Sequence, residues 1–219
     1  MPVSIIQEVP IFRELPKEAI DWLAERSTTR NYPKGTIVLA EGQSGNELFV
    51  IQAGRSKVYV SNADGRELVL YHAGPGDYVG ELAIIDDQPR SATVQTLEKS
   101  TFLILNQNDM TELLGQNPEF SLVIIRALTE KVRLATNSVR SLGLDPVYRR
   151  LTELLTAEAI ECPDTGDSLV EKLSHRQIAE KIGSSREMVS KLMRDLEKGG
   201  YIEGTGARIV VKSRFPSSW

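Results

Sequence analysis

The amino-acid sequence predicts an α+β protein in which an antiparallel β domain, a long helix and a helical C-terminal domain follow one another. Three observations predict this fold class. Short β-branched or aromatic runs between turn residues fill positions 32–105, an apolar helical repeat spans 117–142, and two closely spaced helix caps lie near the C-terminus. We therefore divide the chain into residues 1–116, 117–142 and 143–219.

The composition supports two folded domains and excludes several kinds of site. The chain has 219 residues, of which 41% are hydrophobic, so it has enough apolar side chains for two cores. It lacks an apolar run of about 18 residues and a basic N-terminal segment, so we expect no membrane span and a cytoplasmic protein. Cys162 is the single cysteine, which excludes an intrachain disulfide and an iron–sulfur cluster. We interpret it as an incidental thiol.

The first part of the chain is predicted to be mainly β structure. Residues 11–26 carry apolar side chains at helical intervals on both sides of Pro16, which predicts short leading helices. Six strands are then expected in an antiparallel barrel or sandwich, with Asp64-Gly65 as the clearest hairpin turn. His72 lies alone in a strand, and we interpret it as structural. The predicted strand runs are TIVLA, ELFVI, SKVYV, ELVLY, TVQT and TFLIL.

Residues 79–94, VGELAIIDDQPRSATV, contain groups that suit a sugar phosphate. Gly80 permits close backbone approach, and Glu81-Leu82-Ala83 can open a helical turn whose N–H groups face an anion. The Arg90 guanidinium matches a phosphate, Ser91 adds a hydroxyl, and Glu81 can accept from a ribose hydroxyl. From the residues alone, a turn with a surface salt bridge is the simpler interpretation.

The repeat from Asn117 to Leu142 predicts one long helix. Asn117 is expected as its N-cap and Pro118 as its first residue. The helix is long enough to link two domains, and its apolar seam is typical either of packing on its own domain or of pairing with a second copy. The seam residues, spaced alternately three and four apart, are Ile125, Leu128, Val132, Ala135, Val139 and Leu142.

A helix break at residues 143–146 is followed by a predicted helix-turn-helix. Residues 147–160 have a helical period, and residues 161–167 form a polar loop. Ser174 with Gln177 predicts one capping box, and Ser184 with Glu187 predicts a second after a turn at Gly183. A two-stranded wing, YIEG and ARIVVK, is expected to follow.

The second predicted helix has one apolar stripe and one charged face. The overall net charge is −4, yet residues 172–214 hold ten Lys or Arg against five Asp or Glu. Arg, Lys and Glu near the start of such a helix suit hydrogen bonding to base edges in the major groove of DNA. A solvated charged face is the competing interpretation. The exposed residues expected there are Arg186, Glu187, Ser190, Lys191 and Arg194.

The order PKGTIVLAEGQSGNELFVIQAGRSKVYVSNADGRE, then PGDYVGELAIIDDQPRSATV, resembles the cyclic-nucleotide-binding domain of the catabolite activator protein (CRP/FNR) family of bacterial transcription regulators. The resemblance covers nearly the whole chain. It implies a jelly-roll β-barrel, a dimerisation helix, a winged helix-turn-helix and cyclic AMP as the effector. It also implies a phosphate-binding cassette made of Gly80, Glu81, Leu82, Ala83, Arg90 and Ser91. Replacing Arg90 with Ala is then expected to abolish the effector response and to spare the fold.

The sequence departs from the family on the long helix. The cyclic-AMP-binding members that it resembles carry a Thr-Ser pair there that contacts adenine, and this pair falls at Ala135 and Thr136. One hydroxyl is therefore missing, whereas Thr136 and Asn137 could still reach a base. The alternatives for the effector are therefore cyclic di-GMP, another nucleotide, or no effector at all.

The resemblance also assigns residues of the C-terminal domain. It implies that Arg186, Glu187 and Lys191 read a DNA half-site, with Ser190 on the same face. Ser174, His175 and Arg176 match a segment that contacts phosphate, joined by Ser185. Residues 161–167 match a region that contacts RNA polymerase.

We therefore expect a homodimeric transcription regulator that binds palindromic DNA, with no metal, haem or catalytic activity. The sequence shows no catalytic pair of carboxylates, no Cys/His dyad and no metal-ligand spacing, which disfavours an enzyme. A regulatory subunit that acts on a protein partner is the further alternative, and the basic second helix disfavours it.

Overall fold

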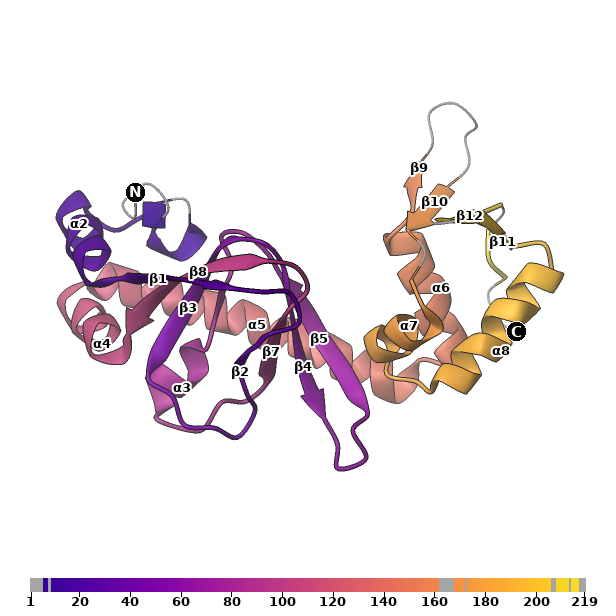
Figure 1. The fold of residues 1–219 in the computed structure, drawn as a ribbon, viewed down its shortest axis with the longest axis horizontal. Helices are drawn as coiled ribbons and strands as arrows, with labels where there is room; N and C mark the ends of the chain where they lie inside the picture. Colours follow the sequence, from indigo (N-terminus) through magenta and orange to yellow (C-terminus); the bar gives the residue numbers. More distant parts are fainter. Residues whose placement is uncertain are drawn as a thin grey trace. The chain divides into compact units, whose positions relative to one another are not determined.

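The computed structural model describes residues 6–7, 9–161, 168–171, 173–205, 208–212 and 214–216. The chain divides into two compact units. The main boundary lies within the long helix between Arg133 and Leu134, and the second unit also includes Arg66–Leu68. Figure 1 gives the order of the elements along the chain. No helix in the described part of the chain is long and apolar enough to cross a bilayer.

The first unit begins with two short helices, as the sequence predicts. The 3₁₀ helix η1 spans Pro10–Phe12, and α2 spans Lys17–Arg26. Pro16 has extended backbone angles and precedes α2, because its ring fixes φ and it lacks an N–H. Ile20 and Leu23 are the main buried residues of α2.

The β domain consists of two four-stranded antiparallel sheets, in the orders β1-β8-β3-β6 and β2-β7-β4-β5. All six predicted strands are present, and two short strands, β1 and β6, join them. Gly65 has φ 74° in the predicted hairpin turn, and its N–H donates to the Asn62 carbonyl. The strands are β1 Thr28–Tyr32, β2 Ile37–Leu39, β3 Glu47–Ala53, β4 Ser56–Ser61, β5 Glu67–Ala73, β6 Tyr78–Val79, β7 Thr93–Thr96 and β8 Ser100–Asn106.

Strand β3 separates two hydrophobic cores. Phe49 and Ile51 face the core between the sheets, whereas Leu48 and Val50 belong to a core that the helices cover. Because successive side chains of a strand point to opposite faces, a strand buried on both sides must be apolar throughout. Strand β8 follows the same rule, with Phe102 and Ile104 on one face and Leu103 and Leu105 on the other.

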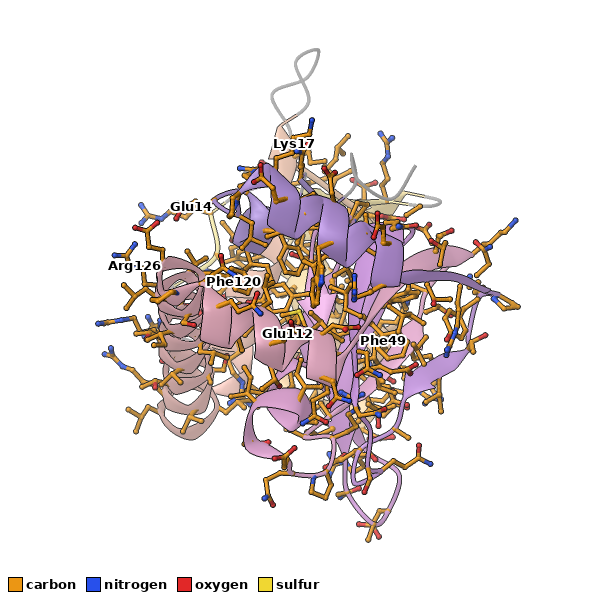
Figure 2. All side chains as sticks on the ribbon, turned by 90° about the vertical axis from the view of Figure 1, so that its left-hand side faces the viewer. Glu14, Lys17, Phe49, Glu112, Phe120 and Arg126 are labelled. Atoms are coloured by element: carbon orange, nitrogen blue, oxygen red, sulfur yellow. The ribbon has the colours of Figure 1, made fainter. Side chains whose placement is uncertain are left out.

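Helices cover the outer face of the first sheet. They are η1 and α2, already described, together with α3 Glu81–Asp86, α4 Gln107–Gln116 and the first half of α5 Pro118–Leu144. Phe120 stacks on Phe12 with ring centroids 5.7 Å apart, which joins α5 to η1. In Figure 2, Lys17 and Arg126 project outward, whereas Phe120 is buried among the helices.

Helix α5 starts at Pro118 as predicted, but Asn117 has a different part. Its side chain donates to the Leu113 carbonyl at 3.0 Å, so it caps the end of α4, while its own carbonyl accepts from the Ser121 N–H. At the other end, α5 continues two residues past the predicted terminus at Leu142, through Gly143. The predicted break at residues 143–146 is confirmed, but it lies at Asp145 and Pro146, after Gly143.

Arg150 explains the later end of α5. Its Nη1 donates to the carbonyls of Ser141, Leu142 and Asp145 at 3.3, 2.8 and 3.3 Å. The last carbonyls of a helix lack partners within the helix, so these bonds stabilise the final turn. The next helix then begins after Pro146.

The second unit contains the predicted helix-turn-helix and wing. Its elements are α6 Val147–Ala157, α7 His175–Ile182, α8 Arg186–Lys198, β9 Ile160–Glu161, β10 Ser168–Glu171, β11 Ile202–Thr205 and β12 Arg208–Val211, with sheet order β11-β12-β10-β9. Strands β9 and β10 flank the predicted polar loop. Residues 162–167, which include Cys162 and most of the segment assigned to RNA polymerase, lie outside the described residues.

The two helix caps differ in how well they match the prediction. Ser174 and Gln177 form the predicted capping box at the start of α7. The cap of α8 is Ser185 rather than Ser184, because the Ser185 hydroxyl accepts from the Met188 N–H. The Ser184 N–H instead donates to the Ala179 carbonyl and helps to end α7.

Removing one side chain from the core behind β8 tests this layer arrangement. Leu103 has no exposed surface, so Leu103→Ala should lower the free energy of unfolding of the first unit by about 2–5 kcal/mol. Ile37→Ala, at a side chain that is half exposed, should cost under about 1.5 kcal/mol. Denaturant titration measures both, and equal losses would contradict the two-core arrangement.

Candidate functional site

The predicted phosphate cassette is built around the turn before α3. Gly80 has φ 88°, a conformation that side chains with a Cβ rarely adopt, and Glu81 is the first residue of α3. A Cβ on Gly80 would also collide with the Arg90 guanidinium. The group that approaches Gly80 closely in the structure is the protein's own Arg90, and the close approach to an anionic ligand stays a prediction.

Arg90 lies beneath this turn and is almost fully buried, with 5% of its surface exposed. Its Nη1 donates to the Gly80 carbonyl and its Nη2 to the Glu47 carbonyl, both at 2.7 Å. Burial lowers the pKa of Arg90, and the carboxylates of Glu47 and Glu81 act in the opposite direction. On this geometry Arg90→Ala is also expected to cost stability, because two backbone carbonyls would lose their donor.

Glu81 makes an ion pair that the sequence did not predict. Its side chain is 9% exposed, and its Oε1 lies 2.8 Å from Nζ of Lys131 on α5. The same ammonium lies 4.3 Å from the centre of the Tyr78 ring and 5.8 Å from that of Tyr71. A buried carboxylate, one cation and two aromatic rings thus meet at one end of the β domain.

Both tyrosines stay protonated at neutral pH. Burial, followed by the charge of Glu81, raises the pKa of Tyr78 to about 12 and raises the pKa of Tyr71 well above its usual value. Each phenol is therefore a neutral hydrogen-bond donor and acceptor. No sequence signal identified these residues or Lys131, because only the folded chain brings them to Glu81.

An open hollow of about 380 Å³ lies beside the cassette. Among the residues assigned to the cassette, Ala83 lines it, whereas Leu82 and Ser91 are exposed at the surface. Gly45 also lines the hollow, and a Cβ on it would lie 2.7 Å from Nη2 of Arg90, so a larger residue there would have to displace the guanidinium. The full lining is Ser44, Gly45, Asn46, Ala83, Asp87, Gln88 and Gln107.

The two residues assigned to base contacts, Thr136 and Asn137, lie on the part of α5 that belongs to the second unit. Thr136 and Asn137 are exposed and belong to the second unit, whereas Glu81, Arg90 and Lys131 belong to the first. His72 is exposed on β5. Among the described residues, no group of three or more His, Cys, Asp or Glu side chains is arranged to hold a metal ion.

The second candidate site is the outer face of α8. Its predicted apolar stripe is buried, and Arg186, Glu187, Lys191 and Arg194 are exposed. Ser190 lies among them but is half-buried, and its Oγ is 2.8 Å from Nδ1 of the His175 ring. The buried stripe consists of Val189, Leu192, Met193 and Leu196.

Several predicted phosphate-contacting side chains already have partners within the protein. The hydroxyls of Ser174 and Ser185 accept from the first turns of α7 and α8. The Arg176 Nε donates to Glu180 at 2.8 Å, and this bond raises the pKa of Arg176. The Arg176 side chain is nevertheless 71% exposed, so its other N–H groups lie on an exposed side chain.

The chain is similar to known proteins along most of its length. A family model described as "Cyclic nucleotide-binding domain" matches residues 29–117, and a model described as "Crp-like helix-turn-helix domain" matches residues 147–214.

Curated relatives match nearly the full chain. A "CRP-like cAMP-activated global transcriptional regulator" of Mycobacterium tuberculosis is 29% identical over 211 residues, covering 95% of this chain and 94% of that protein. A "cAMP-activated global transcriptional regulator CRP" of Salmonella typhimurium is 24% identical over 196 residues, covering 88% and 93%. Among solved structures, the c-di-GMP responsive regulator CLP of Xanthomonas campestris has the same fold, with TM-score 0.78, 22% identity and coverage of 91% of this chain and 100% of that one.

The buried position of Arg90 leads to a stability prediction. Arg90→Ala should lower the free energy of unfolding of the first unit by about 1–3 kcal/mol, because it leaves the Gly80 and Glu47 carbonyls without their donor. Arg55→Ala is the matched control, since Arg55 pairs with Glu98 at the exposed surface and should cost under about 1 kcal/mol. Chemical denaturation compares them, and no difference would rule out a structural part for Arg90.

Proposed function

Since the chain belongs to the CRP/FNR family of transcription regulators, we propose that it is a homodimer that binds palindromic DNA under the control of a cyclic nucleotide, with cyclic AMP as the first candidate. The observation that carries this proposal is the convergence of Glu81 and Arg90 on the turn at Gly80. We place the protein in the cytoplasm and assign it no catalytic activity.

The cassette has the groups that a cyclic nucleotide needs. Such a ligand carries one anionic phosphate and a ribose hydroxyl that donates hydrogen bonds. Glu81 can accept from the hydroxyl, and the cations Arg90 and Lys131 provide the complementary charge for the phosphate. In the structure, Glu81 is paired with Lys131, so a ligand hydroxyl would share or replace that ion pair.

The identity of the nucleotide is the finer part of the proposal. The relatives from Mycobacterium tuberculosis and Salmonella typhimurium carry names that describe activation by cyclic AMP, which supports this ligand. Ala135 in place of a hydroxyl residue weakens adenine recognition, and the structural similarity to a c-di-GMP responsive regulator makes cyclic di-GMP the second candidate. An effector controls the protein only through its different affinities for two conformations.

The exposed face of α5 supports the homodimer. Val132 and Val139 are 64% and 70% exposed, and both occupy the predicted a/d seam. An apolar stripe of this length on a soluble helix is typical of a coiled-coil contact. The second copy of the chain would cover it.

DNA recognition is proposed to use α8. Arg186 and Lys191 are positioned to donate to guanine, and Glu187 to accept from cytosine, near the end of the helix that enters a major groove. Two copies in a dimer would meet half-sites about 34 Å apart. By the same resemblance, RNA polymerase is the proposed protein partner.

Calorimetric titration with cyclic AMP, cyclic GMP and cyclic di-GMP, without and with a palindromic duplex, tests the proposal. If cyclic AMP alone binds and tightens DNA binding, the effector is identified. If cyclic di-GMP does so instead, the DNA function stands and the effector changes. Failure to prefer any duplex at moderate salt would overturn the DNA function and favour a regulatory subunit that acts on a protein.

A charge on the α5 seam should separate the dimer. Val139→Glu places a carboxylate in the proposed interface, so sedimentation should show a monomer at micromolar concentration and weaker binding to the palindrome. Arg140→Glu, at the neighbouring position outside the predicted seam, is the control and should stay dimeric. A dimeric Val139→Glu protein would contradict the proposed interface.

Arg186 should contribute to base recognition. Arg186→Ala is expected to weaken binding to the cognate duplex by about 1–3 kcal/mol and to relax preference at one base pair. Binding to duplexes that differ at single positions measures this. An equal loss on every sequence would mean that Arg186 contacts only phosphate.

A further inference from the structure

The hydrogen bond between Ser190 and His175 gives these two residues different parts in DNA binding. We propose that Ser190 is a positioning residue whose hydroxyl donates to Nδ1 of His175 and so holds the ring with its Nε2–H available for a phosphate contact, and that Ser190 itself reads no base. This inference rests on the proposed DNA-binding function. It assigns to Ser190 a part that differs from that of its exposed neighbours on α8.

The first argument is the position of the pair. His175 is the first residue of α7, and Ser190 lies in the second turn of α8. The bond therefore joins the two helices of the helix-turn-helix, which Figure 1 labels α7 and α8. Both side chains are half-buried, whereas Arg186, Glu187 and Lys191 are exposed. A side chain held between helices is less available to a base edge than one that projects into solvent.

The second argument is the chemistry of the contact. The 2.8 Å distance joins the Ser190 Oγ to Nδ1 of the ring, and one of the two atoms must donate. If the hydroxyl donates, Nδ1 is the acceptor and the proton of the neutral ring is on Nε2. The ring then presents an N–H on the side opposite Ser190. If Nδ1 donates instead, Nε2 of the neutral ring has a lone pair and repels an anion.

Of these two neutral forms, only the first offers a hydrogen bond to a phosphate oxygen, which is an acceptor. The positive end of α7 lies at His175, and it also favours an anion there. Arg194 adds to this arrangement, because its Nε donates to the Ser190 carbonyl at 3.1 Å and ties the Ser190 turn to the next one.

The first test needs no DNA. The chain has two histidines, so a long-range ¹H–¹⁵N spectrum contains two rings, and His72→Gln assigns them. At a pH where the ring is neutral, we expect the His175 ring to carry its proton on Nε2 in the wild type. Ser190→Ala should give a mixture of tautomers, and Ser190→Thr should restore the single form. A proton on Nδ1 in the wild type would overturn the proposal.

The second test uses a palindromic duplex selected by the wild type and its single base-pair variants. Ser190→Ala should weaken binding by the same factor, about 3- to 10-fold, on every duplex, and Ser190→Thr should recover it. In His175→Ala protein, adding Ser190→Ala should cause no further loss, because Ser190 acts through His175. Thermal melts of each variant exclude a general loss of folding.

The outcomes separate the two proposals. A change of preference at one base pair in Ser190→Ala, or full additivity with His175→Ala, would mean that Ser190 reads a base and would overturn this inference. If the wild type prefers no duplex, the proposed function fails, and the tautomer measurement still decides whether Ser190 fixes the ring.

Discussion

The fold of the first unit depends on strand β3, which must be apolar on both faces and still begin beside the polar turn at Gly80. Its four central residues are buried, two in each core. Pairing of Phe49 with Val79 joins β3 to β6, and Gly80 follows directly. This pairing brings the Gly80 carbonyl close to that of Glu47 at the start of β3, and Arg90 donates to both. The pairing of this doubly buried strand with β6 thus helps to determine where the cassette arginine lies.

The cassette contains two buried charged side chains, Glu81 and Arg90. Removing a charge from water is unfavourable, and nearby groups offset this desolvation cost. An isolated buried carboxylate is strongly unfavourable, so Glu81 is stable there because Lys131 supplies the opposite charge at 2.8 Å. The rings of Tyr71 and Tyr78 stabilise the same ammonium. A ligand that enters must offer groups of comparable strength to both charges. A cyclic nucleotide offers a donor and an anion together.

Local sequence patterns predicted most of the fold. Strand periods, the Asp64-Gly65 turn and the capping box at Ser174 depend on residues that are close in the chain, and all were confirmed. The cap of α8 was wrong by one residue, since two adjacent serines look alike and only the end of α7 decides which one is free to cap.

The site was only partly predictable, because its partners are distant in sequence. Glu81 and Arg90 were chosen from a short motif, but Lys131 is 50 residues from Glu81, and Glu47 is 43 residues from Arg90. No helical or strand period records such a pairing. The bond between His175 and Ser190 was missed for the same reason, although both residues had been selected individually.

Arg150 links two parts of the second unit, the end of α5 and the turn between α7 and α8. Besides the three carbonyls at the end of α5, its Nη2 lies 3.5 Å from the Gly183 carbonyl in the turn between α7 and α8. One guanidinium therefore contacts both the last turn of α5 and the turn between α7 and α8. Because all four contacts come from a single side chain, loss of that side chain would remove them together.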